Sequence, residues 1–385
     1  MALLQMPNLA LSPGIHQIHQ LFSDKSLSTI QTVMNLPSFI SPFVTLTTAY
    51  AIGRGIVSKK HVVVTGLLLV ALTGLISTVA HTQFWHLVLM SCVLGLGTSG
   101  YQSNGTSLIA DYYTLEERPR ITGFQTSCIN GGGILMSLCG GLLATVSWHG
   151  GYLMLLLALP IAIVAMLGIP NVKLSRGGRK DETDPGEGKM RLHPDVLLFA
   201  AIIFVFMALY NVLGSNISTH LAARNLGNSS VSGYTTAIRM LGGAVFGLVF
   251  SRLSRKLGDL TTVLGFLALF LDMIILSAAK SIVWVIVGEF IGGSGFSLLL
   301  PQCLFSVSKV LNRKTSALAT AVTSCIAPSF GSFFSAMIFT NLTTALYGDS
   351  TVMRYRFVSF VALACAVICA VVFTVRKKRR APEDA

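Results

Sequence analysis

Apolar runs of about twenty residues or more, separated by short polar connections, dominate this chain of 385 residues. About twenty apolar residues are what a helix needs to cross a hydrocarbon core roughly 30 Å thick. The pattern therefore predicts a helical membrane protein that crosses the bilayer many times. The clear runs are 29–53, 62–81, 84–111, 120–147, 151–170, 196–221, 231–251, 261–279, 282–308, 316–345 and 356–375.

A weaker run, residues 1–21, precedes these and makes twelve predicted transmembrane helices. Its apolar part, Met1 to Ile15, would extend only about 22 Å as a helix. Asn8, Pro13, His16 and His19 dilute it further. Either the first helix is short, or the chain starts inside it.

One long polar segment, Asn171 to Asp195, divides the chain nearly in half. Its glycines and prolines lie among mixed charges, which is typical of a flexible linker. We therefore expect an N-terminal six-helix bundle over 1–170, a linker over 171–195, a C-terminal six-helix bundle over 196–375 and a basic tail over 376–385.

The net charge of +13 raises the possibility of a nucleic-acid partner, but its distribution favours membrane topology. Only 11% of the residues are charged, against about a quarter in soluble domains. Most basic residues lie in alternate connections, and positive charge marks the cytoplasmic side. The linker and the C-terminus are thus expected to be cytoplasmic, with no nucleic-acid partner. The few basic residues outside that set are Lys25, Arg224, Arg239, Lys280, Arg354 and Arg356.

The stretch Ser107–Gly123 joins two predicted helices through a short, highly charged turn. It reads Ile-Ala-Asp, then Glu-Glu-Arg, then a glycine that opens the next helix. The run Gly131–Gly133 follows, and Trp148 comes after the helix. Together these features resemble the fourth and fifth spans of the major facilitator superfamily. The resemblance implies two six-helix bundles related by an axis along the membrane normal.

The two halves also resemble each other. Thr126–Ile129 recurs as Thr323–Ile326, and Gly95 matches Gly292 at the same offset. Because this repeat coincides with the number of spans and the position of the linker, it supports a pseudo-symmetric fold.

Charged loops give a candidate cytoplasmic latch between the bundles. Asp111 ends one helix, where the helix dipole disfavours it, so we expect a basic partner, Arg118 or Arg120. The same dipole favours Glu117 at the start of the next helix. Gly247–Lys256 resembles the family's Gly-x-x-x-Asp-Arg-x-Gly-Arg-Lys loop, with Ser251 replacing the acid. The resemblance implies a latch, whereas positive-inside topology alone also explains such loops. The latch candidates are Asp111, Glu117, Arg118, Arg252 and Arg255.

Three charged residues lie inside predicted spans: Arg239, Asp272 and Glu289. A charge at a helix centre costs about 2.5–3.5 kcal/mol, so each is a functional candidate. All three lie about 10–13 Å from the outer boundary. In one interpretation, Arg239 pairs permanently with an acid and orders the helices. In the other, Arg239 contacts an anionic substrate while Glu289 exchanges a proton. The resemblance places span nine outside the cavity, so it implies a structural role for Asp272.

Uncharged polar residues on the spans form a second group of candidates. Gln102, Asn211 and His220 are predicted to contact the substrate or the coupling ion. Hydrogen bonds between helices are the competing explanation for such residues. The others in this group are Asn35, Asn104, Gln125, Asn130, Asn216 and Gln302.

The chain also departs from the family's proton-linked drug antiporters. Those proteins often have an arginine a few residues before the Gly-x-Gly of span four, whereas Met90–Gly97 contains no basic residue here. In span five, Met136-Ser137 stands where their signature has Gly-Pro. Both departures weaken an assignment to drug antiport.

These features predict a secondary transporter that works by alternating access, with proton-coupled uptake or exchange of an organic anion. Efflux of lipophilic drugs is the alternative within that class, and a non-transporting receptor is the alternative outside it. No Walker sequence supports ATP hydrolysis. An enzyme is not expected, because Ser137 has no histidine in mid-span near it.

The expected partners are a small-molecule substrate, a proton and the lipid bilayer, and the chain is expected to be a monomer. The seven cysteines lie in apolar spans without metal spacing, so no metal or cofactor is expected. Short loops favour a bacterial inner-membrane protein.

Overall fold

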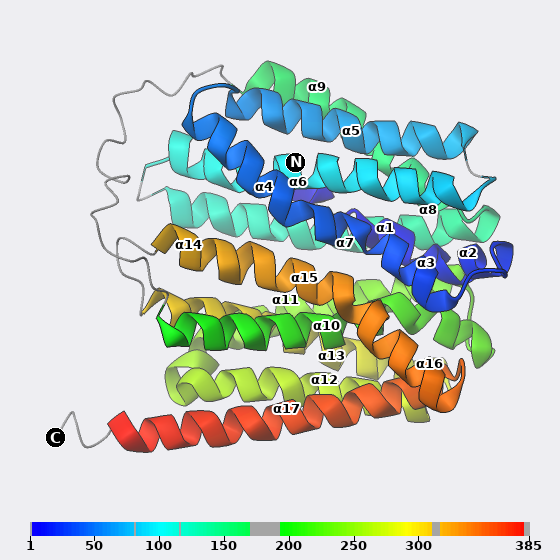
Figure 1. The fold of residues 1–385 in the computed structure, drawn as a ribbon, viewed down its shortest axis with the longest axis vertical. Helices are drawn as coiled ribbons and strands as arrows, with labels where there is room; N and C mark the ends of the chain where they lie inside the picture. The colour runs from blue at the N-terminus through cyan, green and yellow to red at the C-terminus, as the bar shows by residue number, and fades with distance from the viewer. Residues whose placement is uncertain (1, 81, 115–116, 170–192, 310–315, 381–385) are drawn as a thin grey trace. The chain divides into compact units, whose positions relative to one another are not determined.

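The computed structural model describes residues 2–80, 82–114, 117–169, 193–309 and 316–380, and these are helical apart from short connections (Figure 1). Within the helices, the side chains of 106–107, 109–111, 118–120, 122–123, 126, 316–317 and 377–380 lie outside the description. The chain divides into two compact units. The first comprises Met1–Ser26 and Ile30–Arg191, and the second comprises Leu192–Ala385 with Leu27–Thr29. The predicted linker falls outside the described residues except for 193–195.

Nine stretches of the described chain are long and apolar enough to cross a membrane. One of them, Ser229–Ala278, contains two helices and accounts for two of the predicted spans. Ten spans are thus clear, and two broken segments over 2–21 and 27–53 correspond to the remaining pair. The prediction of twelve spanning segments is thus met for ten of them, whereas the two N-terminal segments are not long and apolar enough by the same measure.

The first unit begins with short helical pieces and continues with long helices. Its elements are η1 (Ala2–Leu4), α1 (Asn8–Leu11), η2 (Ser12–Gly14), α2 (Ile15–Leu21), α3 (Leu27–Met34, apart from its first three residues), α4 (Leu36–Gly53), α5 (Lys59–Val79), α6 (Phe84–Tyr112), α7 (Arg118–Val146), α8 (Gly150–Leu153), η3 (Met154–Leu157) and α9 (Ala158–Gly168).

The broken first segment is held by glycines of α7 and polar side chains of α6. A Cβ at Gly132 would overlap the backbone of Leu3, and one at Gly140 would overlap the backbone of Ala10. Only glycine permits this approach. Tyr101 donates a hydrogen bond to the Leu4 carbonyl. The segment is therefore packed in the unit although it forms no single helix.

The second unit is built from longer helices. Its elements are α10 (Pro194–Ala223), α11 (Ser229–Leu257), η4 (Gly258–Leu260), α12 (Thr261–Ala278), α13 (Ile282–Ser308), α14 (Ser316–Ala321), η5 (Val322–Ile326), α15 (Ala327–Ser335), η6 (Ala336–Thr340), α16 (Asn341–Tyr347) and α17 (Thr351–Arg380). The segments η5 and η6 are π-helical turns within one continuous helical span that runs from α14 to α16.

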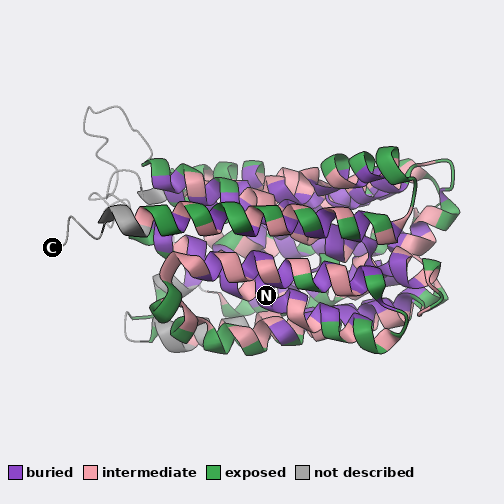
Figure 2. Cartoon of the chain, turned by 90° about the horizontal axis from the view of Figure 1, so that it is seen from below, coloured by how far each residue is buried: buried purple, intermediate pink, exposed green. Residues whose placement is uncertain are grey.

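Helices α10 and α17 are antiparallel and bonded near both ends. At one end Arg376 Nη1 lies 2.7 Å from Asp195 Oδ1. Near the other end the Tyr355 hydroxyl donates to the Leu213 carbonyl over 3.2 Å. Helix α17 also packs along α12, and its opposite side is exposed (Figures 1 and 2). One side of α17 therefore belongs to the core and the other forms the surface of the second unit.

A reciprocal glycine contact occurs in both units. In the first, a Cβ on Gly66 of α5 would lie 2.6 Å from the carbonyl oxygen of Gly97 of α6. In the second, Gly265 of α12 approaches the carbonyl of Gly295 of α13 at 3.1 Å by the same measure. The pair α5–α6 thus packs in the same way as the pair α12–α13, which supports a structural repeat.

Two glycines, one in α6 and one in α13, pack against the second span of their unit. They show which residues of the two halves correspond. Gly95 packs on Pro37 of α4, and Gly293 packs on Arg239 of α11. Gly292, which the sequence repeat aligns with Gly95, packs instead on Asp272 of α12. By packing, the counterpart of Gly95 is therefore Gly293, one residue beyond the sequence match.

Candidate functional site

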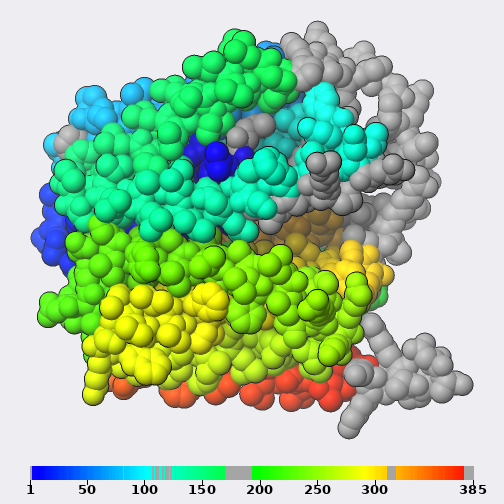
Figure 3. All heavy atoms as spheres, turned by 180° about the vertical axis from the view of Figure 1, so that it is seen from behind, coloured from blue at the N-terminus to red at the C-terminus, as the bar shows by residue number. Residues whose placement is uncertain are grey.

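Arg239 and Glu289 form an ion pair in the interior of the second unit. Arg239 Nε lies 3.3 Å from Glu289 Oε2, and the side chains are 3% and 0% exposed. Their helices, α11 and α13, can approach because Gly293 lies against the Arg239 carbonyl and Gly242 lies against the Phe290 carbonyl. These helices lie side by side in the second unit, which Figure 3 shows from behind. The predicted pair between spans eight and ten is thus present in the structure.

Asp272 of α12 lies in a recess formed by glycines of α13. Its side chain is fully buried, and a Cβ at Gly292 would overlap its Oδ2 atom. A Cβ at Gly288 would lie 3.0 Å from its Oδ1 atom. Neither carboxyl oxygen has a hydrogen-bond partner in the described part of the chain. Asp272 is close enough to Arg239 and Glu289 to interact with them electrostatically.

Tyr210 of α10 completes this group. The guanidinium carbon of Arg239 lies 5.6 Å from the centroid of the Tyr210 ring, within the range of a cation–π contact. A Cβ at Gly214 would lie 3.3 Å from Arg239 Nη2, so a larger residue there would crowd the guanidinium. The buried Tyr210 hydroxyl has no hydrogen-bond partner among the described residues. We call Tyr210, Arg239, Asp272 and Glu289 the buried charge cluster.

The buried charge cluster contains more polar atoms than it satisfies. Among the described residues, Arg239 Nε and Nη1 and all four carboxyl oxygens lack a hydrogen bond of good geometry. Burying such groups without partners costs free energy. With Tyr210 neutral and the other three groups ionised, one positive and two negative charges leave a net charge of −1. One proton would make the cluster neutral, and its donors and acceptors have bonding capacity that the described residues leave unused.

His220, predicted as a substrate or coupling residue, has both ring nitrogens engaged with other helices. Its Nδ1 lies 2.9 Å from the Thr351 hydroxyl of α17, and its Nε2 lies 3.1 Å from the Leu276 carbonyl of α12. A carbonyl only accepts, so Nε2 carries the proton and Nδ1 accepts from Thr351. This geometry is that of a connection among three helices.

Gln102 and Asn211, also predicted to contact the substrate or the coupling ion, each form a hydrogen bond within their own unit. Gln102 Nε2 donates to the Gln5 carbonyl at 2.6 Å and so helps hold the broken first segment. Asn211 Oδ1 accepts from the Ser215 hydroxyl at 2.9 Å within α10.

The candidate latch residues are only partly described. Helix α7 begins at Arg118, and the Glu117 carboxylate accepts from the Thr114 N–H at 3.0 Å and from its hydroxyl at 2.9 Å. These hydrogen bonds hold the pKa of Glu117 below its ordinary value. The side chains of Asp111 and Arg118 lie outside the described residues. Arg252 and Arg255 are exposed near the end of α11.

Gln302 of α13, a second-group candidate in the sequence, belongs to a polar network around the α11–α12 connection. Gln302 Oε1 accepts from the Ser254 hydroxyl at 2.7 Å, and Nε2 donates to Asp259 at 3.3 Å and to Ser306 at 3.0 Å. The Ser306 hydroxyl also donates to Asp259. The side-chain oxygen and nitrogen of Gln302 thus stabilise the connection between α11 and α12.

The search for charged residues inside the predicted spans missed one buried arginine. Arg354, which the sequence suggests as a loop residue, is fully buried in the first turn of α17. It donates to Thr343 at 3.1 Å, to Asn216 at 2.8 Å and to Thr344 at 2.9 Å. A signal existed in the sequence, because Arg354 lies at four-residue spacing from Val358, Ala362 and Ala366, which share one face of a helix.

Comparison with known proteins gives the family. The profile of the Major Facilitator Superfamily matches residues 3–336, whereas no curated protein matches the sequence. Similar solved structures include a POT family transporter in complex with a thioalcohol conjugated peptide, with a TM-score of 0.76 and 12% identity over 97% of this chain and 95% of the other. The nucleoside transporter NupG has a TM-score of 0.70 and 13% identity, with 97% and 98% covered.

A third structure, the POT family transporter PepTSo, has a TM-score of 0.73 and 13% identity over 97% of this chain and 98% of the other. At such identities the likeness shows the fold alone, and the profile supplies the family. The predicted family, the predicted fold and the prediction that the chain is no enzyme are thereby confirmed. The chain belongs to the major facilitator superfamily and is a multi-pass membrane protein that acts as a secondary transporter.

Proposed function

We propose that this chain couples proton movement to the transport of a small organic anion, and that the buried charge cluster is the coupling site. The observation that carries the proposal is the imbalance within the cluster. Arg239 forms an ion pair with the fully buried Glu289, and a second fully buried carboxyl group, Asp272, lies near enough to interact with both electrostatically. The oxygens of both carboxyl groups lack hydrogen bonds in the described part of the chain. A permanent structural ion pair would be expected to have its remaining polar atoms satisfied.

One proton makes the cluster neutral, and the binding of an anion to Arg239 favours protonation of Glu289. When Glu289 is protonated, it no longer neutralises Arg239, and the guanidinium can attract an anionic substrate. When the anion leaves, Glu289 releases its proton and pairs with Arg239 again. Asp272 remains in its glycine recess as the second acid. In this mechanism, substrate and proton bind together.

The two halves of the chain supply the movement. We propose that bundles over 1–170 and 196–375 alternate around the substrate, with the linker and C-terminus cytoplasmic in a bacterial inner membrane. Asp111, Glu117, Arg118, Arg252 and Arg255 are the proposed latch. The fold is compatible with polar substrates, since the similar structures include a nucleoside transporter and a POT family transporter in complex with a thioalcohol conjugated peptide.

Proton flux into proteoliposomes tests this proposal. Purified protein is reconstituted with an internal pH dye and challenged with a panel of small carboxylates and lipophilic cations. The variants are Glu289→Gln and Arg239→Gln, and Asp24→Asn is the control because Asp24 is exposed and far along the chain from the cluster. We expect one or more carboxylates to drive proton entry in wild type and in the control. Glu289→Gln should abolish proton entry but retain exchange of that carboxylate.

Arg239→Gln should abolish both proton entry and carboxylate exchange, because it removes the group that attracts the anion. Substrate transport with no proton movement in wild type, and unchanged activity in both variants, would show that the cluster is structural. A response to lipophilic cations alone would replace anion transport with efflux of lipophilic compounds.

A further inference from the structure

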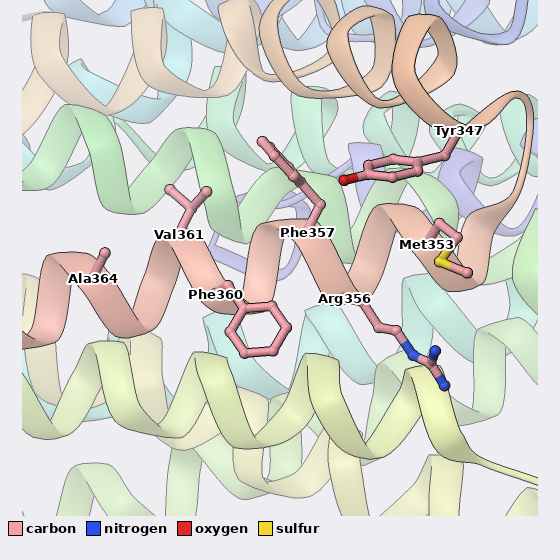
Figure 4. A pocket seen from close by; sticks show the side chains of 7 residues that line it. All are labelled: Tyr347, Met353, Arg356, Phe357, Phe360, Val361 and Ala364. Atoms are coloured by element: carbon pink, nitrogen blue, oxygen red, sulfur yellow. The ribbon is translucent and has the colours of Figure 1, made fainter.

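A groove of about 450 Å³ lies on the exposed side of α17, next to the end of α16. Six of its seven lining residues are apolar or aromatic, and the seventh is Arg356. In Figure 4, Arg356 and Phe360 project from one side of α17, and Tyr347 and Phe357 lie on the other. Val361 and Ala364 continue the groove along the helix. The complete lining is Tyr347, Met353, Arg356, Phe357, Phe360, Val361 and Ala364.

Two arginines near the start of α17, Arg354 and Arg356, have opposite environments. Arg354 points into the unit and has three hydrogen-bond partners. Arg356 is exposed, and within the described part of the chain its guanidinium has no hydrogen bond or ion pair. It nevertheless lies within Thr351–Arg376, which is long and apolar enough to span a membrane. A lipid-facing arginine is costly unless its head reaches a polar or anionic group.

The depth of Arg356 matches the headgroup region. Arg356 is the fifth residue after Thr351, so it lies about 7.5 Å along the helix from the start of α17. A long arginine side chain can extend over that distance toward the membrane surface. Farther along the same helix, the exposed residues are apolar, among them Val367, Ile368 and Val371. The groove therefore runs from an interfacial charge toward the hydrocarbon core.

We propose that this groove is a binding site for an anionic phospholipid. The phosphate binds the Arg356 guanidinium, which presents paired N–H donors to phosphate oxygens. An acyl chain lies along Phe360, Val361 and Ala364, and the distance from Arg356 to Ala364 is about 12 Å along the helix. Tyr347 lines the end of the groove nearest the start of α17, and aromatic residues with a polar end favour the membrane interface.

A phospholipid fits this site better than a soluble anion does. Inorganic phosphate would use Arg356 and leave the apolar groove unfilled. A neutral acyl chain would fill the groove and leave the arginine without a partner. An anionic phospholipid satisfies both parts at once, and the bilayer surrounds this face of a membrane helix.

Native mass spectrometry of the purified protein tests the proposal by measuring the dissociation constant of the first bound lipid. Phosphatidylglycerol and phosphatidylcholine with identical acyl chains separate the headgroup from the chain. Arg356→Gln removes the charge, and Ala364→Phe fills the groove. Lys280→Gln is the matched control, because Lys280 is an exposed cation of the same unit outside the groove.

We expect phosphatidylglycerol to bind more tightly than phosphatidylcholine, with Arg356→Gln weakening it about fivefold, as a basic residue beside anionic lipid contributes about 1 kcal/mol. Ala364→Phe should weaken both lipids, and Lys280→Gln neither. Equal affinity for the two lipids in wild type would overturn the proposal. So would equal losses in Arg356→Gln and Lys280→Gln, no effect of Ala364→Phe, or displacement of the lipid by inorganic phosphate.

Discussion

Replacing Arg354 by glutamine should destabilise the second unit, whereas the same change at Arg356 should not. The Arg354 guanidinium joins α17 to Asn216 of α10 and to Thr343 and Thr344 of α16. Glutamine is too short to reach all three acceptors. It leaves buried oxygens without a donor at the point where three helices meet. Arg356 is two residues away, is exposed and has no such bonds.

The magnitude follows from those three hydrogen bonds. Bonds between side chains of membrane helices contribute about 0.6 kcal/mol each on average, and about 1.7 kcal/mol at most. The three together therefore contribute about 2–5 kcal/mol, and a central value is about 3 kcal/mol. For a unit of this size, each 1 kcal/mol changes Tm by about 2–4 °C, so Arg354→Gln should lower Tm by about 6–12 °C.

Thermal unfolding in detergent, followed by intrinsic tryptophan fluorescence, measures this effect for wild type and both variants. Arg356→Gln should stay within about 2 °C of wild type, because exposed substitutions away from special features usually change stability by less than about 0.5 kcal/mol. Equal shifts in the two variants would refute the assignment of opposite faces to Arg354 and Arg356.

Two further predictions concern helix packing and pH. Gly293→Ala should lower Tm, because the new methyl group would overlap the Arg239 carbonyl and overpacking costs about 1–3 kcal/mol. Gly247→Ala is the control. Nothing lies within 4 Å of its new Cβ, so Tm should stay unchanged or rise. Hydrogen bonds from Thr114 lower the pKa of Glu117 in the folded state. The resulting stabilisation is present above the unfolded pKa and is lost as the pH falls through the folded pKa. The Tm difference between wild type and Glu117→Gln should therefore shrink on acidification, and a difference that grows in acid would contradict this.

Much of the fold could be predicted from sequence because long apolar runs report the number of spans directly. The same pattern could not show how the N-terminal run is built. Its break into short helices depends on close approach to Gly132 and Gly140 of α7, which are distant in sequence. The division of Ser229–Ala278 into two helices was predictable, since Arg252 to Lys256 interrupt the apolar pattern.

The charged part of the candidate site was also accessible from sequence. Arg239 and Glu289 stand out because charge is rare within spans, and their equal predicted depth fits the ion pair that the structure shows. His220 and Gln302 were harder to interpret, because a polar residue on a helix has the same sequence signature whether it faces a ligand or bonds a neighbour. Arg354 and Arg356 differ by only two positions, so their opposite environments depend on the rotation of α17.

The π-helical turn Val322–Ile326 suggests how the two repeated halves of the chain can come to present different side chains. It includes the repeated Thr-Ser-Cys-Ile tetrapeptide, whose first-half copy lies in the continuous helix α7. A π-turn accommodates one extra residue and rotates everything beyond it by about 100° relative to a regular α-helix. An insertion of a single codon could thus present a different set of side chains from the later part of the span without adding a span or a loop. Such an event would let one copy of an ancestral repeat acquire new contacts while the other kept the old ones.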